Sequence, residues 1–318
     1  MNFAIIGAGM AGLACADALH EAGHCAALFD KGRGPGGRMS TRRMSTPLGE
    51  ASFDHGAQYF TARDPRFRRL VDGWCGADIA APWPAAGGDT WVGVPGMNAI
   101  IRHMASVHEV RWGHLVTGMV RKEGSWWLMD KAGESGPFDA VILAIPAEQA
   151  AAILSLHDFA MARIALQARS QPCWTSMFVF DQPIDGIPPV VRNQGSVAWA
   201  ARNSAKPGRS GPETWVVQAS PVWSADHLEE PQEQISALLC AAFAEATACD
   251  IPEPLVAASH RWRFALSAGT GDGALWNPSI ALGVCGDWLL GPRIECAWLS
   301  GRMLGDCCVG AVKQAVSA

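Results

Sequence analysis

The chain has 318 residues, a formal net charge of −5, 49% hydrophobic residues and 17% charged residues. This composition is typical of a packed globular protein and excludes a largely disordered chain. The slight acidic excess provides no general basic face, so we expect no nucleic-acid partner.

Ten cysteines are spread along the chain without a C-x-x-C pair, which favours reduced thiols over a disulfide framework. The apolar N-terminal segment lacks a charged leader and contains Asp17, so we interpret it as mature structure. No apolar run reaches the length of about 18 residues that crossing a bilayer requires. We therefore expect a cytoplasmic protein with no membrane partner, and no residue spacing indicates a metal site.

The first 30 residues predict one β-α-β unit. The run "NFAII" is typical of a buried strand, "MAGLACADALHEAG" has helical spacing and ends at Gly23, and "CAALFD" predicts a second strand. Further along, Asp64 and Pro65 predict the start of a helix over 66–74. The dipeptide Glu123-Gly124 predicts a hairpin, and "FDAVILAIP" predicts an apolar strand.

Tryptophan and proline become frequent after residue 147, which indicates a second domain with antiparallel strands and helices. The last part again has the pattern of strand, turn and helix, so we expect it to rejoin the first domain. The predicted fold class is α/β: a Rossmann-like nucleotide-binding domain with a second, α+β substrate domain on a largely antiparallel sheet. The expected limits are 1–64, 93–146 and 269–318 for the first domain, and 65–92 and 147–268 for the second.

A dinucleotide motif follows the first strand. Gly7, Gly9 and Gly12 form G-x-G-x-x-G between strand and helix, and Asp30 ends the next strand. In this motif the first glycine makes a tight turn, the second lets a diphosphate approach, and the third allows close packing. Asp30 would accept hydrogen bonds from ribose hydroxyls, and its charge opposes a 2′-phosphate there.

A second glycine-rich loop follows at once, in "DKGRGPGGRMSTRR". Gly36 and Gly37 would let the chain pass close to a diphosphate, which the guanidinium of Arg38 can bridge. A nicotinamide-binding domain has no standard use for this loop, so it favours the longer cofactor FAD. Arg42 and Arg43 remain without an assigned role.

Several segments together resemble the FAD-binding signatures of the flavin-containing amine oxidase superfamily, and within it the renalase-like branch. They are "AIIGAGMAGLACADAL", "LFDKGRGPGGRMSTRR", "DHGAQYFTA", "VGVPGMNAI", "CGDW" and "ECAWLSG", joined in the second domain by "WAARNSAKPGR" and "SHRWRFA". The resemblance implies an FAD-binding domain of the amine oxidase and p-hydroxybenzoate hydroxylase type, with FAD held without a covalent bond.

The resemblance also implies the cofactor-binding positions. Gly286 and Asp287 match a late G-D pair near the ribityl chain, Val116 matches a backbone contact to adenine, and the helix after Glu295 would point its N-terminus at the flavin pyrimidine edge. The family usually has glycine at Cys296, where a packed thiol is favoured over one beside the flavin. The expected positions are Gly7, Gly9, Met10, Ala11, Gly12, Asp30, Lys31, Gly37, Arg38, Met39, Gln58, Tyr59, Phe60, Val116, Gly286, Asp287, Glu295, Cys296 and Ala297.

The substrate pocket is expected around Tyr59, Trp199, Asn203 and His260, with no acid or base assigned. Trp199 offers a stacking surface and Asn203 an amide that could orient a carboxamide, while Phe60 could equally wall the pocket or pack in the core. His260 could bond in the pocket or be a satisfied structural histidine. The resemblance to amine oxidases implies that Lys206 could hold a water near the flavin, but its Lys-Pro-Gly sequence is more typical of an exposed turn.

Three functions are consistent with these residues. The first is an FAD-dependent oxidase of the renalase type, which the resemblance implies would oxidise 2- or 6-dihydro isomers of NAD(P)H to NAD(P)+ with O2 as acceptor and H2O2 as product. The second is an amine oxidase or desaturase of a bulky apolar substrate. The third is a flavin-bound protein without enzymatic activity that recognises a partner.

Overall fold

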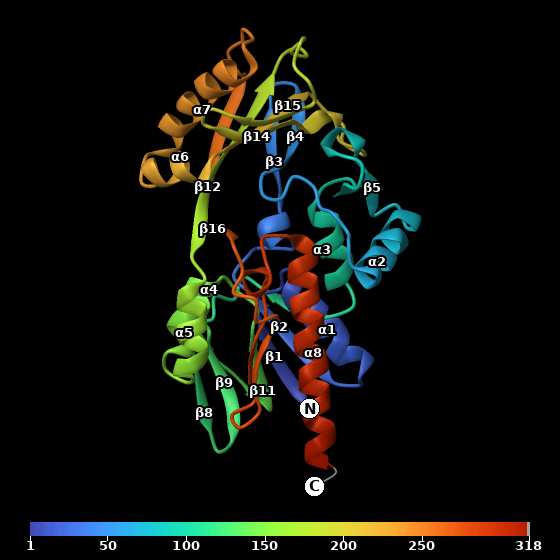
Figure 1. The fold of residues 1–318 in the computed structure, drawn as a ribbon, viewed down its shortest axis with the longest axis vertical. Helices are drawn as coiled ribbons and strands as arrows, with labels where there is room; N and C mark the ends of the chain where they lie inside the picture. The colour runs from blue at the N-terminus through green and yellow to red at the C-terminus, as the bar shows by residue number, and fades with distance from the viewer. Residues whose placement is uncertain (317–318) are drawn as a thin grey trace.

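A six-stranded sheet forms the lower half of the molecule (Figure 1). The computed structural model describes residues 1–316, and its first sheet has the strand order β17-β18-β11-β1-β2-β7. Every neighbouring pair in it is parallel except β17 with β18. The strands are β1 (Asn2–Ile6), β2 (Cys25–Asp30), β7 (Glu109–Trp112), β11 (Ala140–Leu143), β17 (Leu275–Asn277) and β18 (Leu282–Val284).

The predicted β-α-β unit is present at the start of the chain. Helix α1 (Met10–Glu21) connects β1 to β2, which pair in parallel with Phe3 opposite Ala26. Because both faces of a parallel sheet are covered, β1 is apolar from Phe3 to Ile6, and Phe3 and Ile5 are completely buried. The chain turns after α1 at Gly23, which has a φ of +80°.

The end of the chain rejoins this sheet, as predicted. Strand β18 pairs in parallel with β11, and helix α8 (Ile294–Val316) then packs along α1. Two glycines, Gly301 and Gly305, make this packing close. A Cβ on Gly301 would lie 2.1 Å from the Ala11 carbonyl oxygen, and one on Gly305 would lie 2.4 Å from the Ala18 Cβ.

A small antiparallel sheet covers one side of the first sheet. It has the order β10-β9-β8, with β8 (Gly118–Lys122), β9 (Ser125–Asp130) and β10 (Gly133–Phe138). The predicted hairpin turn is Glu123-Gly124, whose φ angles are +52° and +85°. Positive φ at both central residues is the requirement of the tight turn that matches strand twist.

The upper half of the molecule is the predicted antiparallel sheet, with the order β13-β14-β15-β12-β16 (Figure 1). Helix α7 packs on it through Ile235, Leu239 and Phe243, which share a core with Trp215. The elements of this part are α4 (Ala147–Leu154), α5 (Phe159–Gln167), β12 (Ser170–Phe180), β13 (Val190–Gln194), β14 (Val197–Arg202), β15 (Glu213–Ala219), α6 (Pro221–Asp226), α7 (Gln232–Thr247) and β16 (Val256–Ser267).

A β-hairpin from the first part of the chain reaches the upper sheet. Strands β3 (Thr41–Thr46) and β4 (Gly49–Asp54) place Ala51 and Phe53 against β12 and β15. In the sequence, the basic run up to Arg43 suggested a flexible loop. In the structure, the end of this run lies inside strand β3. Because a hairpin crosses the junction, the two halves share a buried contact and not only a linker.

The remaining elements surround the junction. Helix α2 (Pro65–Gly76) begins as predicted, with the Asp64 carboxylate accepting the backbone N–H groups of Arg66 and Phe67. Helix α2 packs beside α8, and the ring centres of Phe67 and Trp298 are 5.4 Å apart. The residue limits predicted for the two domains stay a prediction. The other elements are β5 (Ala80–Pro82), β6 (Trp91–Gly93), α3 (Asn98–Ala105) and the short 3-10 turns η1 (Gly37–Met39), η2 (Pro84–Ala86), η3 (Asn203–Ala205) and η4 (Asp287–Leu289).

Among the helices described, none has both the length and the apolar character needed to span a membrane.

The α1–α8 contact gives a test of the fold. The substitution Gly301→Ala should lower the free energy of unfolding by about 1–3 kcal/mol, because the new methyl group overpacks the helix contact. The matched control is Gly310→Ala in the same helix, where a Cβ would meet no atom within 4 Å. It should raise stability by about 0.5–1 kcal/mol through helix propensity alone. Thermal and urea unfolding measure both; equal effects of the two substitutions would contradict the packing.

Candidate cofactor and substrate site

The first glycine turn holds the end of β1 against the start of α1. Gly7 has a φ of +104°, which favours glycine, and its N–H donates to the Phe29 carbonyl at 2.8 Å. A Cβ on Gly12 would lie 2.0 Å from the Gly7 carbonyl oxygen, whereas one on Gly9 would meet no atom within 4 Å. The helix is therefore packed closely at Gly12, while the backbone at Gly9 is open to a ligand.

Asp30 and the second glycine loop complete the same surface. The Asp30 carboxylate accepts the N–H of Ala8 at 2.8 Å and the N–H of Gly32 at 2.7 Å. Gly37 has a φ of +53°, and a Cβ there would lie 4.0 Å from the Gly9 Cα. The two glycine-rich segments thus lie together at the carboxyl ends of β1 and β2, the edge where α/β sheets bind nucleotides.

Arg38 and Asp287 form a bidentate ion pair. The two terminal nitrogens of Arg38 donate to the Asp287 carboxylate at 2.9 and 2.6 Å, and one also donates to the Ala265 carbonyl at 3.3 Å. Both residues were predicted to contact FAD, at the diphosphate and near the ribityl chain. Their pairing joins the second glycine loop to η4, so each side chain fixes the position of the other.

The segment before Val116 runs along the end of β2. The N–H of His114 donates to the Asp30 carbonyl at 2.9 Å, and the N–H of Gly113 donates to the Gly32 carbonyl at 2.8 Å. Val116 itself is 8% exposed. Its backbone therefore lies on the same side of the sheet as the predicted ribose acid, which is consistent with the adenine contact expected from the sequence.

The start of α8 is held by a buried carboxylate. One oxygen of Glu295 accepts the N–H groups of Arg63 and Asp64, both at 2.5 Å. The other lies 3.2 Å from Arg293 without hydrogen-bond geometry. The oxygen bonded to Arg63 and Asp64 ties α8 to the start of α2, and the predicted contact of Glu295 with FAD stays a prediction. Cys296 is 3% exposed, as a packed thiol would be.

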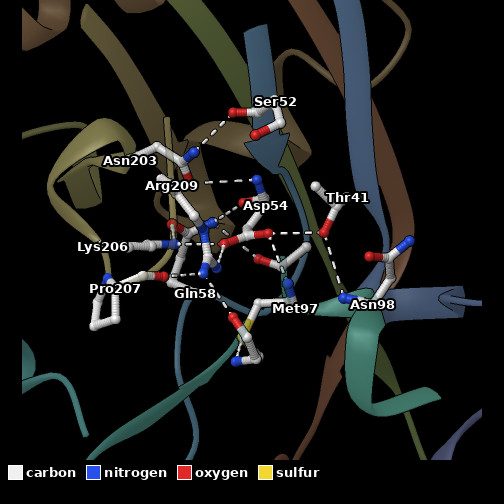
Figure 2. A network of polar contacts seen from close by, with 12 residues as sticks. Thr41, Ser52, Asp54, Gln58, Met97, Asn98, Asn203, Lys206, Pro207 and Arg209 are labelled. Carbon is white, nitrogen blue, oxygen red and sulfur yellow. Dashed lines mark hydrogen bonds and ion pairs between the residues drawn. The ribbon is translucent and has the colours of Figure 1, made fainter. Parts of the chain in front are cut away.

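A buried polar network lies at the junction of the two halves (Figure 2). Its centre is Asp54 at the end of β4, which is completely buried. Lys206 Nζ lies 3.2 Å from one carboxylate oxygen, which also accepts a hydrogen bond from Arg209. The other oxygen accepts from the Thr41 hydroxyl at 2.8 Å and from the Met97 N–H at 2.9 Å. One carboxylate therefore joins segments from four parts of the chain.

The charges of this network perturb one another. Burial alone would raise the pKa of Asp54, but the charges of Lys206 and Arg209 outweigh it and lower the pKa to about 2. Burial lowers the pKa of Lys206 to about 8, despite the stabilising carboxylate of Asp54. Asp54 is therefore ionised at neutral pH, because the alternative would leave two buried cations without an anion.

Two sequence predictions are corrected here. Lys206 was expected in an exposed turn, yet it is 2% exposed, since its ammonium group reaches inward to Asp54 and Gln58. Asn203 was expected to orient a substrate carboxamide, but both ends of its amide are occupied by β4. Its nitrogen donates to the Ser52 carbonyl at 2.8 Å, and its oxygen accepts the Asp54 N–H at 3.3 Å.

Aromatic side chains gather beside this network. The rings of Tyr59 and Trp199 have centres 5.0 Å apart with planes inclined by 31°, and Trp83 lies 6.5 Å from Trp199. Arg192 covers the Trp199 ring at 4.8 Å. Tyr59 and Trp199 are only half-buried. The structure thus brings together two of the predicted pocket residues, on a surface suited to stacking a planar ring.

Other predicted residues occupy the core or the surface. Phe60 is 3% exposed and packs among Phe67, Trp74 and Trp91, so of its two predicted roles the structure shows core packing. His260 is half-buried, its ring centre lies 4.4 Å from that of Trp262, and its ring nitrogens make no hydrogen bond that the structure shows. Gln58 is buried beside Lys206. Four residues near the glycine turns are also buried: Met10, Ala11, Met39 and Ala297. Lys31 is exposed, and the N–H of Gly286 donates to the Ser300 hydroxyl.

Sequence reasoning missed Asp54, Arg209 and Trp83. Asp54 follows the apolar residues of "ASF" at the end of a strand, where a charge needs a partner. Arg209 closes "KPGR", three residues after Lys206. A carboxylate in an apolar strand and two cations in one loop were the available signals, but only the fold shows that they meet.

The residues present fit a dinucleotide cofactor. The first N–H groups of α1 have no side-chain cap, and the helix end provides a positive potential for phosphate. The open backbone at Gly9, the adjacent Gly37 and the carboxylate of Asp30 supply the remaining contacts of a nucleotide site.

Comparison with known proteins supports this conclusion. Residues 5–74 match an NAD(P)-binding Rossmann-like domain, and residues 84–301 match the flavin containing amine oxidoreductase family. Renalase of Mus musculus is 26% identical over 295 residues, which cover 82% of this chain and 83% of renalase.

Solved structures share the fold over almost the whole chain. Cyclohexylamine oxidase from Brevibacterium oxydans IH-35A aligns with a TM-score of 0.72 and 12% identity, covering 98% of this chain and 99% of that one. A candidate protoporphyrinogen oxidase from Exiguobacterium sp. 255-15 aligns with a TM-score of 0.74 and 14% identity, with the same coverage. At these identities the likeness shows the fold alone.

The amine oxidoreductase match spans more than half of the chain, so the protein belongs to the flavin-containing amine oxidoreductase family. Within that family it is similar to renalase, which confirms the resemblance found in the sequence. It is an FAD-dependent oxidoreductase, so the predictions of an enzyme and of FAD are also confirmed.

Substitutions at two glycines of the first turn test folding and cofactor binding separately. Gly9→Ala should leave the unfolding temperature of the apoprotein unchanged, because its Cβ meets no protein atom, but should weaken FAD binding at least about tenfold by occupying the diphosphate approach. Gly12→Ala should lower both stability and affinity. Thermal unfolding of the apoprotein and titration of FAD fluorescence measure the two properties. Undiminished FAD affinity of the Gly9→Ala protein would contradict the assignment.

The Asp54 network predicts an asymmetric response to substitution. Asp54→Asn should lower the free energy of unfolding at pH 7 by about 3–5 kcal/mol, since it leaves two buried cations unpaired. Lys206→Met should cost much less, because Arg209 still pairs with Asp54. Denaturant unfolding measures both values.

The stability of the protein at acid pH provides a further test of the ionised state of Asp54. Because the folded pKa of Asp54 is about 2 and the unfolded value is about 3.9, its contribution is complete above pH 4 and is lost as the pH falls from about 4 to 2. The Asp54→Asn protein should lack this part of the acid loss of stability. An unchanged acid profile would show that Asp54 is not the ionised centre.

Proposed function

We propose that this enzyme oxidises 2- or 6-dihydro isomers of NAD(P)H to NAD(P)+, with one proton and O2 consumed and H2O2 formed. FAD, when bound, would supply the hydride acceptor at N5 and the route of the electrons to O2. The similarity to renalase supports the proposal, and the residues at the junction support it independently.

The observation that carries the proposal is that the buried carboxylates are engaged in ion pairs and hydrogen bonds within the protein. Asp54 pairs with Lys206 and Arg209, Asp287 pairs with Arg38, and Glu295 accepts two backbone N–H groups. These are the acidic residues that are buried in the part of the chain the structure describes. The Glu295 oxygen that makes no hydrogen bond lies 3.2 Å from Arg293. Each of the three carboxylates therefore has a cation beside it, and none is an unpaired anion that could hold a substrate ammonium group or act as a general base. Hydride donation from a reduced ring needs neither, provided that the ring is oriented.

The chain's own residues would provide that orientation. The half-buried faces of Tyr59 and Trp199 offer a stacking surface for a planar ring, and Arg192 covers Trp199. The Trp199 ring N–H is buried without a hydrogen-bond partner, so it is available to an acceptor group of a substrate. Trp83 closes the far side of the group and helps exclude water.

The same aromatic surface favours a second candidate, an oxidase of bulky apolar amines. Tyr59, Trp83 and Trp199 would then form the walls of an apolar pocket. The family match is equally consistent with this activity.

Anaerobic mixing of the FAD-loaded protein with single substrates distinguishes the two candidates. The 2- or 6-dihydro isomer should bleach the flavin absorbance rapidly, and admission of air should release one equivalent of H2O2. Ordinary 4-dihydro NADH is the matched control, since it has the same groups with the hydride at another carbon. It should bleach the flavin at least about tenfold more slowly, because orientation of the donor carbon decides the rate. Bleaching by a panel of amines, but by no dihydronicotinamide, would reject the proposal in favour of the amine oxidase.

A further inference from the structure

Two histidine rings pack against Trp262, and they belong to a group of three basic side chains that the proposed function leaves unused. The three are Arg42 in β3, His55 just after β4 and His260 in β16. The His55 carbonyl accepts the ring N–H of Trp262 at 2.8 Å, and the His55 ring stacks on Trp262 at 5.3 Å between centres. The rings of His55 and His260 have centres 5.0 Å apart. The junction between the hairpin and β16 therefore has a cluster of nitrogen donors.

The strand register places Arg42 on the face that contains this cluster. Arg42 is paired with Phe53 across the hairpin, and paired residues share a face. Phe53 is completely buried against β12 and β15, so that face is directed at the upper sheet. His55 continues the alternation two residues after Phe53, whereas Thr41 and Asp54 point to the opposite side, into the network of Figure 2.

This cluster has no acidic partner. Arg42 makes no ion pair with the side chains that the structure describes, residues 1–311, while its neighbour Arg43 lies 3.9 Å from Glu50. Burial and then His260 lower the pKa of His55 to about 4, and burial and then Arg42 lower the pKa of His260. Asp54 opposes this shift at His55 only weakly, because its charge is already balanced by two cations.

The cluster also has an unused donor. His55 is 7% exposed, its Nδ1 is buried without a hydrogen-bond partner, and its other nitrogen lies 3.4 Å from the Ser40 hydroxyl. A buried polar atom without a partner is uncommon, and it indicates a group that binds there. The charge of the exposed Arg42 guanidinium and the unpartnered nitrogen of His55 together indicate an anionic ligand with several acceptor oxygens.

We propose that Arg42, His55 and His260 form a subsite for a phosphate group of the substrate. The inference rests on the proposed function and deepens it, because it requires the substrate to be a phosphorylated dihydronicotinamide and not a simple amine. His55 begins the segment that leads to Tyr59, and four residues span at most about 14 Å. The phosphate subsite and the ring-stacking surface are therefore close enough for parts of one nucleotide.

The other source of phosphate is the cofactor itself. Its diphosphate has a separate set of expected contacts at Gly9, Gly37 and Arg38. Arg42 lies four residues beyond Arg38, in a strand that runs away from the glycine turns, and it faces β16. The subsite is therefore assigned to the substrate, and the experiment tests the cofactor separately.

The experiment compares two substrates of the same ring isomer, 6-dihydronicotinamide mononucleotide and N-methyl-6-dihydronicotinamide, which lacks phosphate. Anaerobic stopped-flow reduction of the FAD-loaded protein gives the dissociation constant and the limiting rate for each. Arg42→Gln should raise the dissociation constant of the mononucleotide about tenfold or more, as expected for loss of a charge-assisted contact. It should leave the limiting rate and the binding of the N-methyl compound unchanged. His260→Asn should act in the same direction.

The matched control is Arg43→Gln, the next residue in β3, whose side chain is on the opposite face. It should change neither constant for either substrate. Equal effects of Arg42→Gln on both substrates, or no effect on either, would overturn the subsite. So would a loss of FAD affinity in the Arg42→Gln protein with unchanged substrate binding, because the phosphate would then belong to the cofactor.

Calorimetric titration of the FAD-loaded protein with inorganic pyrophosphate provides a readout without turnover. The wild-type protein should bind the anion at least about tenfold more tightly than the Arg42→Gln protein. If no dihydronicotinamide reduces the flavin but this difference is found, the proposed function fails and the anion subsite stands. If the ring compounds reduce the flavin but pyrophosphate binds both proteins equally, the subsite fails and the proposed function stands.

Discussion

The junction between the two halves depends on the ionised carboxylate of Asp54, which has no access to water. Its attraction for Lys206 and Arg209 holds the loop after β14 against the end of β4, and it compensates the cost of burying two cations. The same contact fixes Gln58, which donates to the carbonyls of Asp54 and Gly56 and accepts from Lys206 at 3.1 Å. Tyr59 follows directly, so a charge cluster outside the cofactor surface determines where an aromatic pocket residue lies.

The two halves of the structure contribute different kinds of groups. Glycines at the carboxyl ends of β1 and β2 leave the backbone open at the nucleotide-binding edge of the sheet, while aromatic side chains gather at the junction. The buried carboxylates all stabilise the fold, which leaves aromatic and basic groups for recognition. An active site of this kind favours reactions in which the cofactor does the chemistry and the protein orients the reactant.

The nucleotide-binding half could be predicted in detail because its signals are local. Gly7, Gly9, Gly12 and Asp30 lie within one β-α-β unit, and their roles follow from backbone geometry. The substrate half could be predicted only as an antiparallel sheet. Lys206 was assigned to an exposed turn and Asn203 to a pocket because neither residue's neighbours in sequence reveal Asp54 or Ser52, some 150 positions away. Contacts between distant residues across the junction had no periodic pattern that would predict them.

The packing of α8 on α1 has a consequence for synthesis on the ribosome. Helix α1 is translated well before its partners at Gly301 and Gly305. The five strands of the upper sheet lie within 170–267 and precede α8 in the chain. The upper half can therefore acquire its structure before α1 has its partner. Flavin would be incorporated only after α8 has been translated, and a nascent chain that stalls within α8 would remain colourless.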